Sequence, residues 1–349
     1  MRVLFLTPWY PSEKDAMLGL FVQKHVEAVR AQGVDVRVIH SYTWRELWHE
    51  WKALRRSGWM PDVVQLNVIQ KQGLLALWLK KKYHIPYIIV EHWTGYLPEN
   101  MSVSPKGWRT CLMKQVCKEA EVVMPVSQHL GRAMQSLGFE AKRWMKINNV
   151  VDDFFFAIRT QKKKNSDKII LLNITCFDEP HKNVKGLLRA AKKLSKTRQD
   201  WQLVLVGTGI DYQDVRNYAE SLSFPEGLLR WTGELTPQEV SAEFDRADIF
   251  VLTSNYENAP VVISESLAKG VPIISTNVGG ISEMMDSTCG RLIPPGDDNA
   301  INDAISQMLY LYQEYNCDTI RQHGKQYSFT SVGKQLKEIY VLCMDYSAQ

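Results

Sequence analysis

Two acidic side chains, Glu257 and Glu265, flank the start of a predicted helix, with seven residues between them. An apolar run at residues 249–252 predicts a buried parallel strand just before Glu257. Pro260 suits the first helical position, and Gly270 ends the helix. We therefore expect both carboxylates at the carboxyl edge of a parallel sheet, where open α/β sheets bind ligands. Glu257, on the loop itself, is expected to make little packing contact.

The start of this predicted helix favours one ligand chemistry. It offers backbone N–H groups and the positive end of a dipole to an anion such as a phosphate. Carboxylates beside it accept hydrogen bonds from sugar hydroxyls. A nucleotide sugar carries both groups. The alternative is that both glutamates are solvated residues that suit the positive end of a helix.

The same segment carries a family resemblance. Glu257 and Glu265, with N-A-P-V between them and V-G-G-I-S-E after them, resemble the donor-site motif of the retaining glycosyltransferases of family four, the glycosyl transferases group 1. The resemblance implies the α/β fold named GT-B, in which two Rossmann-like domains face each other across a cleft and a C-terminal helix crosses back to the first domain. It implies that Glu257 holds the transferred sugar and Glu265 the ribose. Further substrate contacts would come from Asn258, Ala259, Pro260 and Val261.

The loop after the predicted strand 169–174 resembles the family's diphosphate-binding loop. The family has an Arg and a Lys there. Lys182 matches the Lys, and Cys176 stands where the Arg is expected. A neutral thiol cannot make the bidentate phosphate contact of a guanidinium. Lys185 or a residue of the first domain could supply a compensating cation. Otherwise the donor binds more weakly, or the alignment with the family is shifted here. The alternative for Lys182 is a solvated surface residue.

Three turn segments resemble substrate-binding positions of the family. Gly207 opens a G-T-G turn after the predicted strand 201–206, beside the expected donor. Glu234 and Leu235 lie in W-T-G-E-L-T, a segment whose backbone reads the nucleotide base in the family. Gly19 matches a glycine that approaches the donor diphosphate. A glycine that merely relieves the turn before a helix is an equal interpretation of Gly19.

His92 follows a strand that begins near Ile85, and it belongs to the segment E-H-W-T-G-Y. This segment resembles the family's histidine-bearing loop, which contacts the transferred sugar. The alternative is a structural histidine. Because aromatic faces suit sugar rings, three nearby side chains are expected to stack on a sugar acceptor. These are Trp93, Tyr96 and Trp108.

The composition is that of an ordinary two-domain globular protein. The chain has 349 residues, of which 45% are hydrophobic and 23% charged. No apolar run approaches the ~20 residues of a membrane span, and the N-terminal apolar run is too short for a signal peptide. The six cysteines form no C-x-x-C pair, and no D-x-D pair appears. We therefore expect a cytoplasmic protein with no metal and no cofactor besides its donor substrate.

The expected domains differ in charge. We expect an acceptor-binding domain at 1–160, a lysine-rich linker at 161–168, a donor domain at 169–330 and a crossover helix at 331–349. Residues 1–160 carry 22 Lys and Arg against 14 Asp and Glu, a net charge of +8, and the rest carries 20 against 24, a net charge of −4. The basic part favours an anionic partner. Because no nucleic-acid motif accompanies it, we expect a phosphate-bearing acceptor or an anionic membrane surface rather than nucleic acid.

A tryptophan-rich stretch at residues 43–60 places apolar side chains at helical spacing. These are Trp44, Leu47, Trp48, Trp51 and Leu54. Tryptophan beside Lys and Arg is typical of a helix at a bilayer interface, which would make the protein peripheral on the inner face of the membrane. The alternative, which we favour slightly, is a helix packed on its own domain.

The resemblance as a whole implies a reaction. A sugar would move from a nucleotide-diphosphate sugar to a hydroxyl of a saccharide or lipid-linked acceptor, with retention of configuration, in bacterial surface polysaccharide or glycolipid assembly. The catalytic residues would be Glu257, His92 and Lys182, with Lys182 and the helix start stabilising the departing diphosphate without a metal. Two alternatives stay open. One is a sugar epimerase or phosphorylase of the GT-B fold. The other is a non-catalytic nucleotide-sugar-binding subunit, which is possible because Cys176 stands where the family has its diphosphate-binding Arg.

Overall fold

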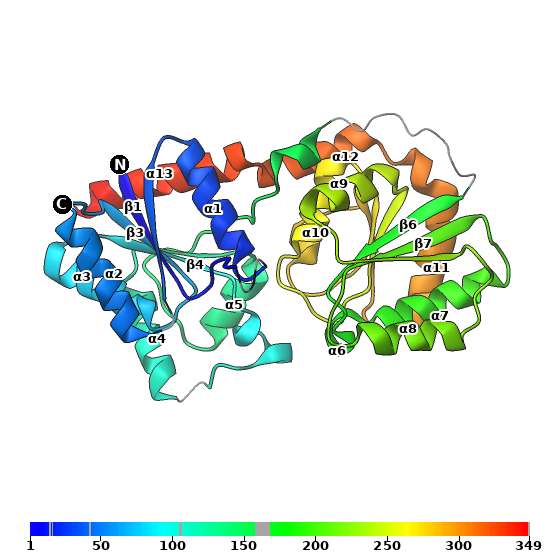
Figure 1. Ribbon diagram of the computed structural model, residues 1–349, viewed down its shortest axis with the longest axis horizontal. Coiled ribbons are helices and arrows are strands. Elements are labelled where there is room, and N and C mark those ends of the chain that lie inside the picture. Colours follow the sequence, from blue (N-terminus) through cyan, green and yellow to red (C-terminus); the bar gives the residue numbers. More distant parts are fainter. Residues whose placement is uncertain (14, 16, 42, 105–106, 158–167, 348–349) are drawn as a thin grey trace. The chain divides into compact units, whose positions relative to one another are not determined.

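The computed structural model describes residues 1–349 except 14, 16, 42, 105–106, 158–167 and 348–349 (Figure 1). The chain forms two compact units, one comprising Met1–Val150 with Tyr327–Gln349 and the other Val151–Gln326. It leaves the first unit at residue 150, where we expected 160, and returns at 327, where we expected 331. The expected linker, apart from Lys168, lies outside the described residues.

The first unit is built on a parallel sheet with the strand order β2-β1-β3-β4-β5. Its central strands β1, β3 and β4 are buried, which is why they form continuous apolar runs in the sequence. The strands are β1 (Arg2–Thr7), β2 (Asp35–His40), β3 (Val63–Asn67), β4 (Tyr87–Glu91) and β5 (Val122–Pro125). The helices are α1 (Leu20–Ala31), α2 (Trp44–Arg56), α3 (Gln72–Tyr83), α4 (Trp108–Glu119) and α5 (Gln128–Ser136), with short 3₁₀ turns η1 (Thr94–Tyr96) and η2 (Pro98–Asn100).

The C-terminal helix α13 (Phe329–Ser347) packs on the first unit, as predicted. In Figure 1 it runs beside α1. A Cβ atom on Gly333 would lie 2.4 Å from the carbonyl oxygen of Ala28, so glycine lets the two helix backbones meet. The Tyr340 hydroxyl donates a hydrogen bond to Gln65 of β3 at 2.5 Å, which ties the helix to the sheet.

The second unit repeats the architecture with a parallel sheet in the order β11-β10-β9-β6-β7-β8. The predicted strands 169–174, 201–206 and 249–252 coincide with β6, β7 and β9. The strands are β6 (Ile169–Ile174), β7 (Trp201–Val206), β8 (Leu229–Gly233), β9 (Ile249–Leu252), β10 (Ile273–Thr276) and β11 (Gly290–Ile293). The helices are α6 (Glu179–Lys182), α7 (Val184–Ser195), α8 (Tyr212–Ser221), α9 (Pro237–Arg246), α10 (Val261–Lys269), α11 (Asp298–Leu311) and α12 (Cys317–Gly324), with 3₁₀ turns η3 (Asp153–Phe156), η4 (Ile281–Glu283) and η5 (Tyr312–Glu314). The 3₁₀ turn η6 (Lys325–Tyr327) lies where the chain returns to the first unit.

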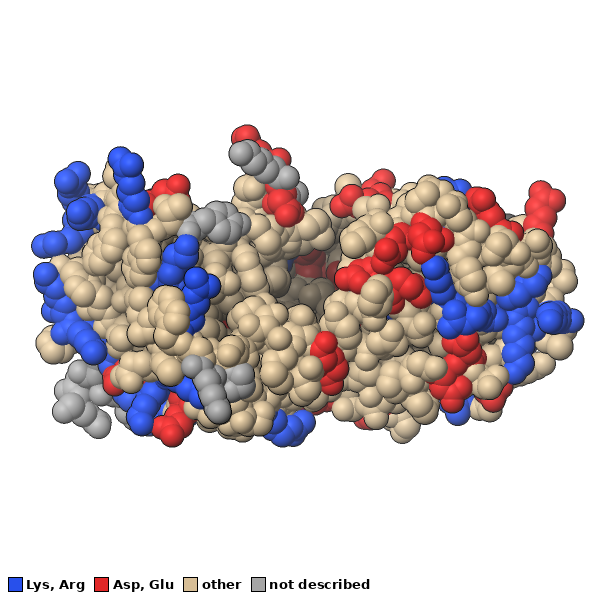
Figure 2. Space-filling model, turned by 90° about the horizontal axis from the view of Figure 1, so that it is seen from below, with Lys and Arg blue, Asp and Glu red and all other residues tan. Residues whose placement is uncertain are grey.

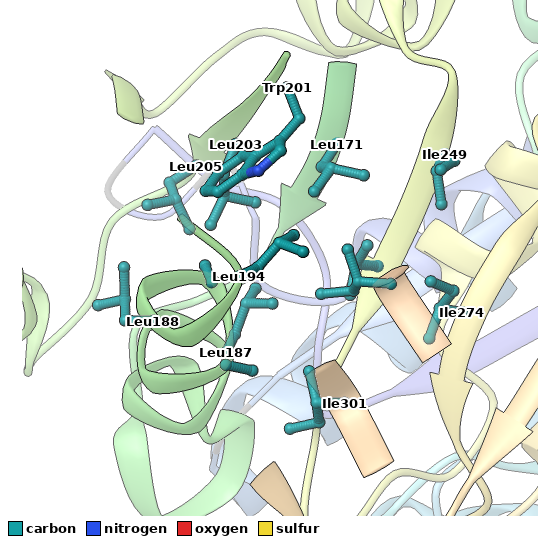
Figure 3. Packing of buried hydrophobic residues seen from close by; sticks show 14 of the residues in the cluster. Leu171, Leu187, Leu188, Leu194, Trp201, Leu203, Leu205, Ile249, Ile274 and Ile301 are labelled. Atoms are coloured by element: carbon teal, nitrogen blue, oxygen red, sulfur yellow. The ribbon is translucent and has the colours of Figure 1, made fainter. Parts of the chain in front are cut away.

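One apolar core holds the second sheet against its helices. Figure 3 shows Leu187 and Leu194 of α7 lying over Leu171 of β6 and Leu203 of β7, with Ile301 of α11 beside them. Burying each such side chain stabilises the unit by about 1.5–3 kcal/mol. The strands β9, β6 and β7 are parallel neighbours, so their carboxyl ends lie at one edge of the sheet.

The tryptophan-rich helix α2 packs on its own unit, which confirms the alternative that we favoured. Leu47 and Trp51 are buried. Trp48 is partly exposed and meets the ring of Trp78 edge-on at 4.9 Å. Trp44, at the start of the helix, keeps 41% of its surface exposed. The predicted stripe is therefore divided between core and surface.

Charge is distributed unevenly on the face drawn in Figure 2. Lys and Arg side chains (blue) predominate over the first unit, at the left, whereas the second unit shows both signs. This agrees with the net charge of +8 counted for residues 1–160. Across the described ranges, no helix combines the length and the apolar character that crossing a membrane requires.

Candidate active site

The central segment of the second unit is the strand β9, the loop after it and the helix α10. Gly270, in the left-handed conformation (φ 70°), ends the helix as predicted. Pro260 is the residue before the helix rather than its first residue, so Val261 begins α10. In this part of the described chain no side chain caps α10, and the N–H of Ile263 donates to the carbonyl of Pro260 at 3.1 Å. The N–H groups that can face an anion are therefore those of Val261 and Val262.

Glu257 is not the loosely packed loop residue that we expected. Only 6% of it is exposed. Its Oε1 atom accepts a hydrogen bond from the Ser254 hydroxyl at 2.7 Å and lies 2.5 Å from Nζ of Lys182. Lys182 and Glu257 are 75 positions apart in the sequence, and the fold brings them into one ion pair.

The loop after β6 carries Lys182, and hydrogen bonds join this loop to the one after β9. The Thr253 hydroxyl donates to the carbonyls of Lys182 and Asn183 at 3.3 and 3.2 Å. Asn255 donates its backbone N–H to the carbonyl of His181 at 2.8 Å. The position of Lys182 relative to Glu257 therefore does not depend on the two side chains alone.

The ion pair is shielded from water. The side chains of Lys182 and Glu257 are 12% and 8% exposed, so their attraction acts in a low dielectric. Removing one partner from such a pair leaves an uncompensated charge and costs about 3–5 kcal/mol. A diphosphate arriving at Lys182 would exchange one anionic partner of the lysine for another.

Glu265 lies in the second turn of α10. Burial, and then the nearby negative charge of Asp152, raise its pKa to about 8. This carboxyl therefore gains or loses its proton close to neutral pH. In its ionised form it can accept two hydroxyl hydrogen bonds, as recognition of a ribose requires.

Glycines allow the loops of this edge to approach one another. Gly207 has φ 119°, and a Cβ atom there would lie 1.9 Å from the carbonyl oxygen of Thr175. Gly279 has φ 55°, and a Cβ atom there would lie 1.8 Å from the carbonyl oxygen of Glu257. No other residue type fits either contact. Gly207 and Gly279 thus allow the close backbone contacts that position the loops carrying Lys182 and Glu257.

The segment expected to read the base adjoins this turn. The N–H of Gly207 donates to the carbonyl of Gly233 at 2.8 Å, which places the G-T-G turn against the end of β8. Glu234 and Leu235 follow directly, and Glu234 is exposed. The structure thus brings three of the predicted positions together at one sheet edge.

Lys185 and Cys176 do not complete a second phosphate contact in the expected way. Nζ of Lys185 lies 2.5 Å from Asp214 and over the ring of Tyr218, both on α8. Cys176 is exposed, but desolvation by the surrounding loops raises the pKa of its thiol, and the positive charge of Lys182 opposes this effect. Cys176 is therefore close to the ion pair but contributes no cation, so Lys182 carries the positive charge there.

In the first unit, His92 follows β4 and is partly exposed. Its ring packs on that of Phe21, with the centroids 4.1 Å apart. Burial, and then the neighbouring His25, lower the pKa of His92 well below its ordinary value. The imidazole is therefore neutral at physiological pH and can exchange hydrogen bonds with an uncharged hydroxyl. Gly19 has φ 70° and touches the backbone of Trp9, so the fold itself requires glycine there.

Glu91 organises the His92 loop, and sequence reasoning missed it. Its buried carboxylate accepts the N–H groups of His92 and Trp93, both at 2.9 Å, that of Ile69 at 3.0 Å, and the Tyr96 hydroxyl at 3.1 Å. The only available signal was an acidic residue at the end of an apolar strand. Tyr96 is 1% exposed, so the prediction that it stacks on an acceptor is wrong.

One group in the described part of the chain brings potential metal ligands together. Asp286, Cys289 and His323, at the edge of β11 and in α12, have ligand atoms within 4.8 Å of one another. Asp286 also accepts the N–H and hydroxyl of Thr288 at 2.8 and 2.5 Å, which is a local turn contact. None of these residues belongs to the Lys182–Glu257 edge.

Comparison with known families identifies the chain. Residues 1–153 match the family Glycosyltransferase Family 4, and residues 154–326 match Glycosyl transferases group 1. The chain therefore belongs to the family-four glycosyltransferases, as the Glu257–Glu265 segment suggested.

Individual relatives are distant. The alpha-monoglucosyldiacylglycerol synthase of Streptococcus pneumoniae is 22% identical over 298 residues, which cover 79% of this chain and 66% of that protein. The D-inositol 3-phosphate glycosyltransferase of Corynebacterium urealyticum is 22% identical over 350 residues, which cover 94% and 76%. The crystal structure of HepE from Anabaena in complex with UDP has a TM-score of 0.78 at 16% identity, and covers 97% of this chain and 99% of that one. This likeness confirms the predicted GT-B fold.

Proposed function

We propose that this chain transfers a sugar from a nucleotide-diphosphate sugar to an acceptor hydroxyl with retention of configuration. The observation that carries the proposal is the buried Lys182–Glu257 ion pair beside the uncapped start of α10. A cation and a helix start can bind a diphosphate, and a carboxylate between them can bind sugar hydroxyls. HepE was crystallised with UDP, which supports a nucleotide-bearing donor.

The chemical step follows from these groups. Cleavage of the sugar–phosphate bond leaves negative charge on the diphosphate, which Lys182 and the α10 N–H groups stabilise. The acceptor oxygen attacks from the face that the diphosphate leaves, and its proton passes to the departing phosphate oxygen. Glu257 positions the sugar, Glu265 holds the ribose, and the neutral His92 of the first unit contacts the sugar. Fixed protein charges replace a metal ion in this scheme.

The biological setting is proposed from the relatives. The Streptococcus pneumoniae protein is named for synthesis of a glycolipid, and the Corynebacterium urealyticum protein for glycosylation of a phosphate-bearing acceptor. We infer a saccharide or lipid-linked acceptor in bacterial surface polysaccharide or glycolipid assembly, at the inner face of the membrane. The basic first unit suits such anionic partners.

A turnover assay tests the proposal. Purified chain is incubated in EDTA with a panel of nucleotide sugars and candidate acceptors, and the anomeric configuration of the product is read by NMR. The proposal predicts a glycoside with the anomeric configuration of the donor. Transfer that requires a divalent metal, or an inverted product, contradicts it. Donor binding without turnover on any acceptor would favour a non-catalytic subunit instead, which is the alternative that Cys176 supports.

A further inference from the structure

The first unit contains a cavity of about 550 Å³ that the proposed reaction does not yet use. It lies between the start of α2, the start of α3 and the first turns of α4. The side chains that matter for its chemistry are Trp44, Lys71, Trp93, Trp108, Arg109 and Leu112.

The walls of this cavity are apolar groups that water reaches. Trp108 is 69% exposed, and Trp44 and Leu112 are each 41% exposed. Large apolar side chains scattered singly over a surface need no explanation, but several that gather around one hollow mark a binding site. Their faces suit a hydrocarbon chain, because contact with it removes apolar surface from water on both sides.

The charged side chains that line the cavity are basic, while Glu46 of α2, which does not line it, interacts electrostatically with Lys71. Of the described residues that line it, the charged ones are Lys71 and Arg109. Lys71 precedes α3, where the positive end of the helix dipole adds to its own charge. The Arg109 guanidinium lies 5.4 Å from the ring centroid of Trp108. An apolar wall that ends in two cations is complementary to an amphiphile with an anionic head.

The cavity adjoins the loop that carries His92. Its lining residues Ile69 and Trp93 both donate their backbone N–H to the buried carboxylate of Glu91, and so does His92. The loop after β3 begins with Val68 at φ 64°, a conformation that a β-branched residue adopts only under constraint. A ligand in the cavity would therefore contact Trp93, the residue after His92, while the His92 ring itself packs on Phe21 and His25 of α1.

We propose that this cavity binds the lipid phosphate of a lipid-linked saccharide acceptor. The hydrocarbon chain lies against the indoles of Trp44 and Trp108 and against Leu112, and the phosphate lies between Lys71 and Arg109. The role of the bound lipid as an acceptor rests on the glycosyltransferase function proposed above. Binding of the lipid phosphate follows from the cavity itself.

The test uses the full chain and farnesyl phosphate, at concentrations where the farnesyl phosphate is monomeric. Calorimetry and tryptophan fluorescence measure its binding. Farnesol supplies the chain without the charge, and inorganic phosphate supplies the charge without the chain. We expect saturable binding of farnesyl phosphate, with both fragments binding at least tenfold more weakly. Absence of farnesyl phosphate binding overturns the proposal, and so does equal binding of farnesol. Attachment to anionic vesicles without binding of the monomer also overturns it, because surface attraction then suffices.

Two variants locate the site. We expect Trp108→Ala and Arg109→Gln each to weaken farnesyl phosphate binding about tenfold without lowering the melting temperature. The matched controls are Ile210→Ala, which removes an 89% exposed apolar side chain from the second unit, and Arg56→Gln, which removes an exposed charge from the far end of α2. Equal effects in variants and controls overturn the assignment.

The same proteins separate this proposal from the proposed function. Thermal shifts with nucleotide sugars should be unchanged in Trp108→Ala and Arg109→Gln, because neither residue is among those that we assign to the donor. If the parent chain binds farnesyl phosphate but no nucleotide sugar, the cavity stands and the glycosyltransferase function fails. If it binds nucleotide sugars but no farnesyl phosphate, the opposite holds.

Discussion

The loops at the sheet edge of the second unit are held together, whereas those of the first unit leave a cavity open. After β6, β7 and β9, hydrogen bonds and glycine contacts join one loop to the next, and Lys182 and Glu257 are buried in the junction. Around the cavity of the first unit, Trp44 and Trp108 remain exposed. The difference fits the two tasks that we propose. A diphosphate needs charges fixed before it arrives, while an acceptor with a hydrocarbon chain needs accessible apolar surface.

The largest expected effect comes from breaking the ion pair of the second unit. Glu257→Gln should lower the transfer rate by ~10²–10³, the usual loss when one charged transition-state contact is removed. It should also destabilise the fold by about 3–5 kcal/mol, because Lys182 keeps a buried charge without its partner. Turnover and urea unfolding measure the two effects.

A double variant separates the two effects of that change. Lys182→Met combined with Glu257→Gln removes both charges, so most of the lost stability should return while the activity stays low. If Glu257→Gln turns over like the parent chain, Glu257 has no role in the reaction. If the single variant is as stable as the parent, the buried pair is not a strong interaction.

A pair of tryptophans on one helix tests the division between core and surface in the first unit. Trp51→Ser should destabilise the chain by about 3–5 kcal/mol, because the indole is 1% exposed. Trp44→Ser should change the free energy of unfolding by less than about 0.5 kcal/mol. If anionic vesicles bind the chain at low salt, Trp44→Ser should weaken that binding. Equal melting temperatures of the two variants would contradict the assignment of Trp51 to the core.

At a pH above 8, where Glu265 is ionised, Glu265→Gln should weaken nucleotide binding by about 1.5–3 kcal/mol, the typical contribution of hydrogen bonds to a charged group. The matched control is Glu314→Gln, an exposed position in the same unit. Calorimetry with the nucleotide that binds the parent chain measures both. Unchanged nucleotide affinity in Glu265→Gln would show that Glu265 does not contact the ribose.

The same glutamate predicts a pH dependence of stability. The pKa of Glu265 is raised to about 8 in the folded chain, above its ordinary value near 4.5, so the folded state holds this proton where the unfolded state has lost it. The contribution of Glu265 to stability is therefore fully present below pH ~4.5 and is lost as the pH rises toward 8. Glu265→Gln should gain stability over the parent chain across this interval. A constant difference between the two melting temperatures from pH 5 to 8 would contradict the raised pKa.

The smallest expected effect is Cys176→Arg, which adds a cation beside Lys182. We expect donor affinity to rise by up to about tenfold, because a guanidinium can contact a phosphate with two hydrogen bonds. Thermal shifts with the donor measure the change, and Cys176→Ser controls for loss of the thiol. Weaker donor binding in Cys176→Arg would mean that this position faces away from the diphosphate.

The sequence predicted best what depends on local pattern. The strands β6, β7 and β9 coincide with their predicted residues, because buried parallel strands are continuous apolar runs bounded by polar residues. The Glu257–Glu265 segment, together with its predicted strand-loop-helix-strand setting and the V-G-G-I-S-E that follows, also predicted the family, which the family matches confirm. The pairing of Lys182 with Glu257 depends on the fold, as does the burial of Tyr96 behind Glu91, and no spacing rule contains such contacts. Lys185 illustrates the same point, because its partner Asp214 lies on another helix.

The central claim is that Lys182, beside the start of α10, binds the diphosphate of a nucleotide sugar. Calorimetry in EDTA, with nucleoside diphosphates and the matching monophosphates, tests it on the parent chain and on Lys182→Met. We predict that at least one diphosphate binds the parent chain more tightly than its monophosphate. In Lys182→Met the ratio of these two affinities should fall at least tenfold. Equal affinity of both proteins for the diphosphate, or no nucleotide binding by the parent chain, would contradict the account.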